Sequence, residues 1–350
     1  MRLHSKFSRL LIMSAFALIG LSSSAAAKST DDVCILNNGD RMTGEIKYLE
    51  QGQLKFKSAY MLDSVQLDWA RVARLESKDQ YIVLLTNGRV FTAHIKLDAT
   101  SVAGDTFRID EGAASIAVKQ SDVLRIRPAN QGFWTQLNGS IDYGFSYTSG
   151  NGQYQTQLSA SATYNGEGYE VSGDMSSNFS GQSGGSSARR NAFDAKYTKL
   201  FHQKWFFGGL VDLLSSEQQS LDLRTTLGGL IGHNFVQTNR TTFNVFSGLA
   251  VARERYSSIG QPRATTADSL IGLGFNTFRF KSLNIGTSFL VWPSLTEPGR
   301  VRMGLNSNLK IELVKDLFWK LSLYENFDSR PPLTAKRNDL GITTSFGWTF

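Results

Sequence analysis

The chain ends in the sequence LGITTSFGWTF (residues 340–350), and the spacing of its side chains decides the fold. Every second residue falls on one face, which is apolar and aromatic apart from one threonine: Leu340, Ile342, Thr344, Phe346, Trp348 and Phe350. The other face carries only glycine, serine and threonine. Because successive side chains of a β-strand point to opposite sides, the stretch predicts a strand with one apolar and one polar face.

The same alternation recurs upstream as far as Phe133. Twelve strands are predicted, near residues 133–148, 153–165, 169–180, 190–201, 205–216, 223–236, 241–256, 266–279, 282–292, 300–313, 318–328 and 338–350. A soluble β-sandwich also alternates, but its strands average about five or six residues, whereas strands that cross a bilayer need about nine to eleven. Aromatic residues lie near alternate strand ends, as membrane interfaces require. Strand length and aromatic placement therefore favour an all-β transmembrane antiparallel barrel.

The connections between the predicted strands alternate in length. Links after even-numbered strands are tight, as at 166–168 and 202–204, and links after odd-numbered strands are mostly longer, as at 181–189 and 329–337. Short periplasmic turns and long outer loops are typical of bacterial outer-membrane barrels. Because an even number of strands brings both ends of the barrel to one side, the preceding residues are expected in the periplasm.

Residues 28–130 contain an internal repeat with a period of about fifty residues. LNNGDR (residues 36–41) is echoed by LTNGR (residues 85–89), and a short strand follows each. The Asn-Gly pairs predict hairpins with type I′ turns, which need positive φ at both central residues. We therefore expect a small tandem-β, SH3-like module over residues 28–130, followed by the barrel over residues 131–350.

Residues 1–27 read as a secretory signal peptide, with a basic start, the apolar run LLIMSAFALIGL (residues 10–21) and a small-residue cleavage site at Ala25–Ala27. The apolar run is too short to span a bilayer. The chain contains one cysteine, Cys34, which excludes an internal disulfide and is expected to be buried in a strand.

The layout resembles the family of salt-induced outer-membrane proteins, a domain-of-unknown-function family of barrels. The matching features are Asn38-Gly39-Asp40-Arg41 and Val65-Gln66-Leu67-Asp68-Trp69, with Trp134, Gly139 and Ser140 at the start of the barrel. Its end at Phe346, Trp348 and Phe350 resembles the C-terminal signal by which the barrel-assembly machinery recognises outer-membrane proteins. The resemblance implies an outer-membrane location and no established chemistry.

The sequence offers little catalytic chemistry. Its four histidines are His4, His94, His202 and His233, and none has the serine or cysteine spacing of a nucleophilic or metal site. Hence no catalytic, cofactor-binding or metal-binding residue is predicted. The net charge of +7 is small and spread over the chain without a basic stripe, so nucleic acid is not expected as a partner either.

Charged residues fall on the polar faces of the predicted strands, where they would point into the lumen. They are Asp142, Asp174, Asp194, Lys196, Asp212, Arg224, Glu254, Arg302, Lys310 and Glu312. A barrel interior tolerates charge, whereas its lipid face does not. The mixed signs suit internal ion pairs that brace the wall, or a narrow polar pore.

A second set of cations collects at the predicted outer rim, with few acidic residues nearby, among them Asp268, Asp328 and Asp339. These cations are expected to bind lipopolysaccharide phosphates: Arg189, Arg190, Arg253, Arg255, Arg300 and Arg337. Three functions remain open from the sequence. They are a structural or stress-adaptation role in the envelope, a narrow channel for small polar or charged solutes, and a periplasmic binding module (residues 28–130) tethered by the barrel.

Overall fold

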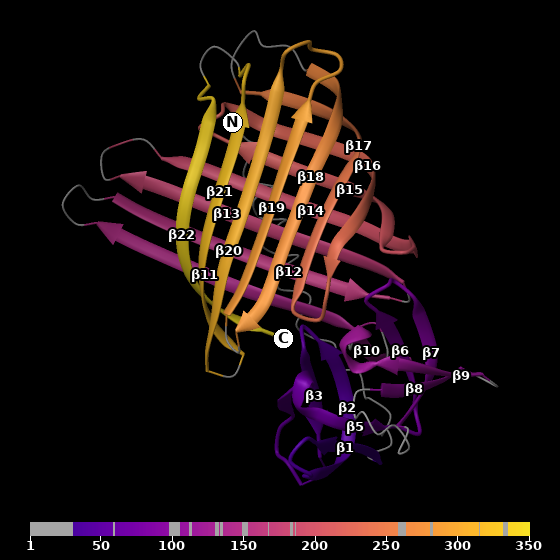
Figure 1. Ribbon diagram of the computed structural model, residues 1–350. Coiled ribbons are helices and arrows are strands. Elements are labelled where there is room, and N and C mark those ends of the chain that lie inside the picture. The colour runs from indigo at the N-terminus through magenta and orange to yellow at the C-terminus, as the bar shows by residue number, and fades with distance from the viewer. Residues whose placement is uncertain are drawn as a thin grey trace.

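The computed structural model describes residues 31–58, 60–97, 106–111, 114–129, 133, 136–148, 153–166, 168–182, 185, 187–257, 264–280, 283–314, 316–331 and 335–350. The predicted signal peptide (residues 1–27) and Trp134 lie outside these residues. The described chain forms a β module followed by a long-stranded barrel (Figure 1).

Ten short strands make up the module. The first five are β1 (Asp32–Leu36), β2 (Arg41–Glu50), β3 (Gln53–Lys57), β4 (Val65–Asp68) and β5 (Val72–Glu76). The second five are β6 (Gln80–Leu85), β7 (Val90–Leu97), β8 (Thr106–Glu111), β9 (Ala114–Lys119) and β10 (Val123–Pro128). A 3₁₀-helix separates the fourth and fifth strands of each set: η1 (Trp69–Arg71) and η2 (Gln120–Asp122).

Strand pairing is the same in the two sets. The first strand pairs with the second and the fifth, since β1 pairs with β2 and β5, and β6 pairs with β7 and β10. The middle strands form antiparallel meanders, β2–β3–β4 and β7–β8–β9. This order, with its 3₁₀-helix before the last strand, confirms the predicted tandem SH3-like module.

The two Asn-Gly turns differ in type from the prediction. Gly39 and Gly88 have φ of 89° and 84°, but the asparagine before each is not in the positive-φ region. The amide of Gly39 donates to Leu36 O and that of Leu36 to Asp40 O, and Gly88 and Leu85 repeat both bonds. This is a type I turn closed by a glycine bulge. A true type I′ geometry occurs instead at Gln51-Gly52 (φ 53° and 73°), between β2 and β3.

One hydrophobic core joins the two copies. It is formed by buried side chains of both: Cys34, Ile46, Leu49, Leu54, Phe56, Trp69, Val72, Leu75, Tyr81, Val83, Leu85, Phe91, Ala93, Ile95, Val118, Val123 and Ile126. The indole of Trp69 donates to Gln120 O at 3.0 Å, and Gln120 Nε2 donates back to the carbonyls of Trp69 and Val72 at 2.5 and 2.6 Å. Cys34 is fully buried, and burial raises the pKa of its thiol to about 12.

Asp32 is a carboxylate within this core. Its Oδ2 accepts hydrogen bonds from the amide of Ile46 at 2.9 Å and the hydroxyl of Tyr81 at 2.8 Å. Burial outweighs these bonds and raises the pKa of Asp32 above its ordinary value. The folded module therefore binds more protons than the unfolded chain, and Asp32 contributes more stability as the pH falls through its raised pKa.

We expect this contribution to appear in the difference between wild type and Asp32→Asn. Between pH 7 and pH 4, the free energy of unfolding of wild type should rise relative to that of the variant, because the asparagine does not titrate. Pulse proteolysis of the full-length chain in graded urea measures it. Asp31→Asn, at an exposed neighbouring position, is the control. A wild-type-minus-Asp32→Asn difference that is constant with pH would contradict the assignment.

The barrel contains the remaining twelve strands. They are β11 (Leu137–Thr148), β12 (Gln153–Asn165), β13 (Tyr169–Gln182), β14 (Ala188–His202), β15 (Trp205–Ser216), β16 (Leu221–Gln237), β17 (Thr241–Tyr256), β18 (Ala264–Phe280), β19 (Leu283–Pro293), β20 (Val301–Val314), β21 (Leu317–Asp328) and β22 (Asn338–Thr349). Each pairs antiparallel with the next, and β22 pairs with β11 to close the barrel. The predicted twelve-stranded antiparallel barrel is confirmed, with three strands (153–165, 205–216 and 241–256) at the predicted bounds.

The closing seam is short and involves the last residue. The register runs from Ser140–Thr349 to Tyr143–Phe346. Beyond it, Phe350 N donates to Gly139 O at 3.0 Å and Gly139 N donates to Phe350 O at 3.1 Å. The Phe350 ring lies against Gly139, where a Cβ would come within 2.5 Å of it. Glycine is therefore required for this close approach.

The outer surface of the barrel is apolar. Ile141, Leu227, Ile231 and Leu249 are among its large side chains that are exposed over about half of their surface or more. A chain of ring contacts follows the end with the short turns: Phe133–Tyr164, Tyr164–Tyr169, Tyr169–Tyr197, Phe201–Phe207, Trp205–His233, His233–Phe235 and Phe235–Phe243. An apolar band with aromatic ends is what lipid contact demands. Phe318, near the start of β21, does not belong to this band, because it is 1% exposed and lies inside the barrel beneath Lys310.

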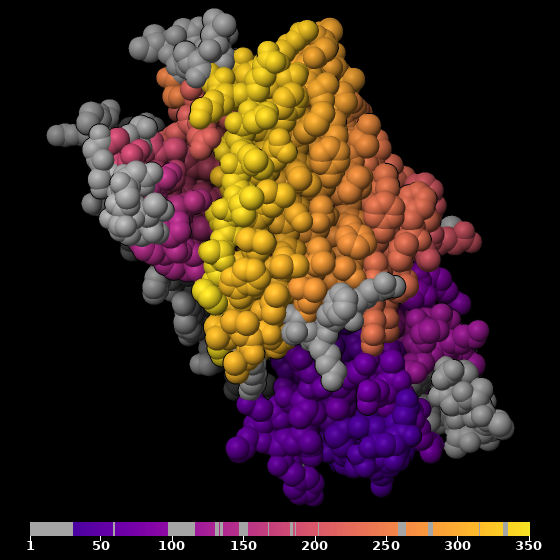
Figure 2. All heavy atoms as spheres, turned by 60° about the vertical axis from the view of Figure 1, so that its left-hand side comes forward, coloured from indigo at the N-terminus to yellow at the C-terminus, as the bar shows by residue number. Residues whose placement is uncertain are grey.

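The module sits against the end of the barrel that carries the short turns (Figure 2). Arg240, in the turn between β16 and β17, forms an ion pair with Asp68 of the module at 2.7 Å. Arg125 of β10 reaches Glu170 at the start of β13 at 3.4 Å. The module therefore caps one mouth of the barrel.

Candidate functional site: a charged lumen closed at both ends

The lumen changes character along the barrel axis. Arginines and carboxylates crowd the end with the long loops, where β14, β16, β18, β20 and β22 begin and β17 and β21 end. Isolated charges and an apolar cluster of Phe206, Leu230, Phe246 and Leu270 follow. Amide and hydroxyl side chains line the end that faces the module. These three zones form the candidate functional site.

Glu254 is the centre of the charged end. It is fully buried and lies 2.6 Å from Arg224, 2.9 Å from Arg300 and 3.3 Å from Arg302, while the hydroxyl of Tyr256 donates to it at 2.6 Å. We call Arg224, Arg300, Arg302, Glu254, Asp268 and Asp328 the arginine–carboxylate cluster. Three positive and three negative side chains balance the charge of the cluster, as burial requires.

The cluster connects walls that are not neighbours. Arg300 precedes β20 and bonds both Glu254 on β17 and Asp328 at the end of β21, the latter at 2.6 Å. Arg224 on β16 reaches Asp328 at 3.5 Å, and Arg302 on β20 pairs with Asp268 on β18. Ion pairs therefore cross the lumen and hold opposite walls together.

A second set of cross-lumen contacts lies beside the cluster. Arg190 on β14 pairs with Asp339 on β22 at 3.6 Å and lies over the ring of Tyr324 at 4.2 Å. Ser216 at the end of β15 donates to the same Asp339 at 2.9 Å. Gln219, in the turn after β15, is buried and donates to the carbonyl of Asn326 on β21 at 3.3 Å. This end of the lumen is therefore filled by side chains and by a turn.

Charges nearer the module are more dispersed. Asp142 on β11 is buried and accepts from Lys320 at 2.8 Å and from Ser345 at 2.6 Å. Lys310 donates to Thr349 at 2.9 Å, and Lys196 lies over the ring of Phe246 at 4.5 Å. Asp174, Asp194 and Asp212 are register partners on three adjacent strands and form a row on the wall. Glu312 is half-buried near the end of β20.

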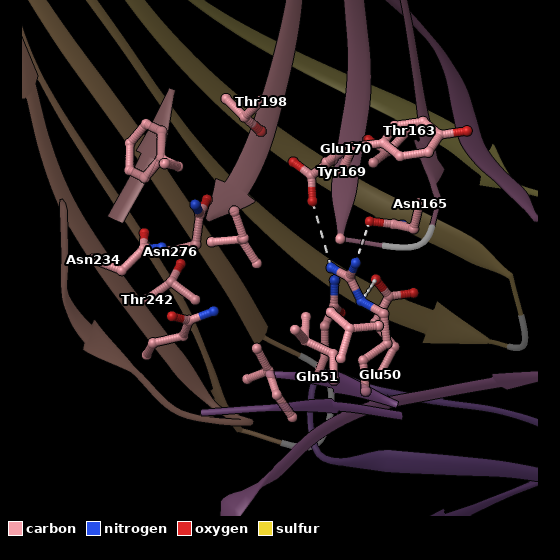
Figure 3. Close-up of a pocket in the computed structure, with 18 of the residues that line it drawn as sticks. Glu50, Gln51, Thr163, Asn165, Tyr169, Glu170, Thr198, Asn234, Thr242 and Asn276 are labelled. Carbon is pink, nitrogen blue, oxygen red and sulfur yellow. Dashed lines mark hydrogen bonds and ion pairs between the residues drawn. The ribbon is translucent and has the colours of Figure 1, made fainter. Parts of the chain in front are cut away.

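The module end of the lumen encloses a cavity of about 420 Å³. Figure 3 shows Glu50, Asn165 and Glu170 on one side of it, and Asn234, Thr242 and Asn276 on the other. Arg127 of β10 bonds Glu50 at 2.6 Å and the carbonyl of Gln136 at 3.2 Å. Asn138 on β11 also donates to Glu50, at 3.2 Å. Glu50 thus joins β2, β10 and the barrel at the cavity wall.

Two of the predicted rim cations lie elsewhere. Arg190 and Arg300 were expected to face lipid phosphates, but they are 8% and 4% exposed and paired with internal carboxylates. Desolvation explains the difference. A buried carboxylate without a cation would cost more free energy than an exposed arginine gains by binding a lipid phosphate. Arg189, Arg253, Arg255 and Arg337 are exposed near the long loops, and Arg255 lies 3.6 Å from Asp222.

The sequence interpretation also placed Asp268, Asp328 and Asp339 at the rim, whereas all three are buried in the lumen. The alternation of side chains along each strand could have predicted this position. Asp328 is eight residues from Lys320 and Arg300 is two from Arg302, so each pair shares a strand face. Because Lys320 and Arg302 face the lumen, extending the alternation to the end of each strand places Asp328 and Arg300 in the lumen as well.

Among the residues that the structure describes, no three His, Cys, Asp or Glu side chains lie close enough to hold a metal ion. None of the helical segments described is long and apolar enough to cross a bilayer.

A closed, twelve-stranded antiparallel barrel with an apolar outer band and a charged interior defines an outer-membrane-type β-barrel. The family described as "Protein of unknown function, DUF481" matches residues 141–350, and the chain belongs to this family. No curated protein sequence matches the chain.

Several solved barrels are similar to the chain. The NanC porin is 10% identical with a TM-score of 0.36, over 61% of this chain and 97% of that one. The translocator domain of autotransporter NalP from Neisseria meningitidis is 12% identical with a TM-score of 0.34, over 61% and 87%. The outer membrane channel DcaP of Acinetobacter baumannii is 11% identical with a TM-score of 0.30, over 91% and 94%. The class of the barrel rests on its own strand order and outer surface.

Proposed function

We propose that the protein is a bacterial outer-membrane barrel whose lumen is closed in its resting state and whose role is structural, in envelope integrity and stress adaptation. The observation that carries the proposal is the arginine–carboxylate cluster, which ties β16, β17, β18, β20 and β21 together across the lumen. The module adds a second closure at the opposite mouth. A barrel braced in this way resists deformation and does not offer a wide pore.

The proposal includes an orientation. The module and the short turns would face the periplasm, with the long loops outside, as is usual for outer-membrane barrels. Arg189, Arg253, Arg255 and Arg337 would then lie at the outer rim, where arginine forks can bind lipopolysaccharide phosphates. Phe346, Trp348 and Phe350 would serve as the recognition signal for the barrel-assembly machinery, because they line the exposed outer face of β22.

Cysteine labelling in intact cells tests location and orientation together. Thr296→Cys, in the exposed loop after β19, should react with a membrane-impermeant maleimide. Lys78→Cys, in the module, should react only after the outer membrane is permeabilised. The side chain at this position is 77% exposed, but in the proposed orientation it lies on the periplasmic side of the membrane. The native Cys34 should stay unlabelled, since it is buried with a pKa of about 12. Labelling of Lys78→Cys in intact cells would contradict the orientation.

A narrow channel for small polar or charged solutes is the second candidate. Two observations favour it: the cavity of about 420 Å³ at the module end and the row of Asp174, Asp194 and Asp212 on the lumen wall. Passage would require both closures to open. Conductance across a planar bilayer separates the two functions.

A further inference from the structure

The cavity between module and barrel has walls from both parts of the chain (Figure 3). Glu50, Leu124, Arg125 and Arg127 contribute from the module side. The barrel contributes mostly amides and hydroxyls: Asn138, Thr163, Asn165, Thr198, Asn234, Gln237, Thr238, Asn239, Thr242, Asn244 and Asn276. A volume of about 420 Å³ falls within the range of small-molecule sites, roughly 300–1,000 Å³.

The charges around the cavity are largely matched among themselves. Arg127 bonds Glu50 at 2.6 Å, and Arg125 lies 3.6 Å from Glu50 and 3.4 Å from Glu170. The remaining cation, Lys196, lies over the rings of Phe206 and Phe246 at 5.5 and 4.5 Å. A strongly charged ligand would therefore have to compete with partners already in place.

Three amides of the lining keep a buried polar atom without a hydrogen-bond partner. They are Asn165 at Nδ2, Gln237 at Oε1 and Asn244 at Oδ1. Asn165 and Gln237 are only 2% and 7% exposed. Buried polar atoms are normally satisfied, so these three atoms leave hydrogen-bonding capacity at the cavity wall for a bound group.

The chemistry of a group that would bind here follows from the donors and acceptors that the unpartnered amide atoms require. Each amide presents a carbonyl oxygen and an amino group, whichever way it is turned. A hydroxyl both donates and accepts, so it satisfies either atom, whereas a carboxylate or phosphate only accepts. Phe278 also lines the cavity and offers apolar ring surface. An aromatic face beside convergent amides suits a sugar ring, which has hydroxyls at its edge and C–H groups on its faces.

We propose that the cavity binds a neutral polyhydroxylated solute of mono- or disaccharide size, held by Asn165, Gln237 and Asn244 and enclosed by the module. This site goes beyond the proposed structural role. It makes the joint between module and barrel a place where a solute stabilises the capped state, because a ligand bound by both parts disfavours their separation.

Isothermal titration calorimetry on the full-length chain tests the site. The protein is held in lauryldimethylamine oxide, because maltoside and glucoside detergents carry head groups of the proposed ligand class. The probes are glucose, maltose and trehalose, with glucuronate as the charged comparator. We expect saturable binding of at least one neutral sugar and weaker binding of glucuronate.

Matched variants locate the site. Asn244→Leu and Gln237→Leu should each weaken sugar binding about tenfold or more, the effect of losing one well-placed hydrogen bond. Asn178→Leu is the control, because Asn178 is also buried with a partnerless Oδ1 but does not line the cavity. Heat-modifiable gel mobility confirms that each variant is folded.

Two results would overturn the proposal, and both come from wild type, so they do not depend on the variants folding. One is an absence of heat for all three neutral sugars up to about 10 mM, which would indicate a cavity filled by water only. The other is tighter binding of glucuronate than of any neutral sugar. Neither result bears on whether the lumen is closed, which bilayer conductance decides separately.

Discussion

Replacing Glu254 with glutamine is expected to lower the stability of the barrel by about 3–5 kcal/mol, the usual cost of removing one member of a buried ion-pair network. The carboxylate is fully buried and contacts Arg224, Arg300 and Arg302. Without it, three arginines face two remaining carboxylates, Asp268 and Asp328. The repulsion between the arginines then pushes the walls of the barrel apart at the end with the long loops.

The measurement is the temperature at which the folded band is lost in heat-modifiable gel electrophoresis. Glu297→Gln is a matched control, because it makes the same chemical change next to the same Arg300, at 3.1 Å, on a side chain that is 40% exposed. An exposed pair is worth about 1 kcal/mol or less, so this variant should melt close to wild type. Equal melting of the two variants would show that the cluster does not brace the barrel.

Deleting Phe350 is expected to prevent most of the chain from reaching the closed, heat-modifiable form. The deletion removes the two backbone hydrogen bonds to Gly139, worth about 2 kcal/mol together, and the ring that covers this glycine. The seam between β22 and β11 is short, so each of its bonds matters. An open sheet would then expose unpaired edges, which a bilayer does not tolerate.

A second variant separates the contributions of ring and backbone. Phe350→Ala keeps both hydrogen bonds and loses only the ring, so it should assemble better than the deletion but less well than wild type. The assembled fraction is measured in outer-membrane preparations as the ratio of folded to unfolded bands. Wild-type mobility for the deletion would contradict the role given to the seam.

The barrel could be predicted from sequence because the pattern that specifies each strand lies within the strand itself. Alternation along each strand follows directly from strand geometry, so Leu340 to Phe350 already specify an outer and an inner face. The lengths of the links then give strand number and the side on which the module lies. In the module, the repeated LNNGDR and LTNGR turns identify the tandem copies, although the type I turn with a glycine bulge differs from the predicted type I′ turn.

The lumen network was harder to predict because its pairs depend on closure. Arg300, just before β20, meets Glu254 of β17 across the barrel, and these two strands are not adjacent. No local pattern states which walls face each other at a given depth. The same is true of the cap: Arg125 and Glu170 meet only once the module docks, which neither segment encodes alone. Closure and docking therefore decided which predicted charges became paired.

The most direct test of the closed lumen is a planar-bilayer recording of the purified full-length chain. Wild type is expected to give no stepwise conductance over the accessible voltages, because the arginine–carboxylate cluster fills one end and the module covers the other. Glu254→Gln, recorded in parallel, should also give no steps, because it loosens only the cluster and leaves the module over the other mouth. Steady conductance steps from wild type would contradict a closed lumen and establish an open channel instead.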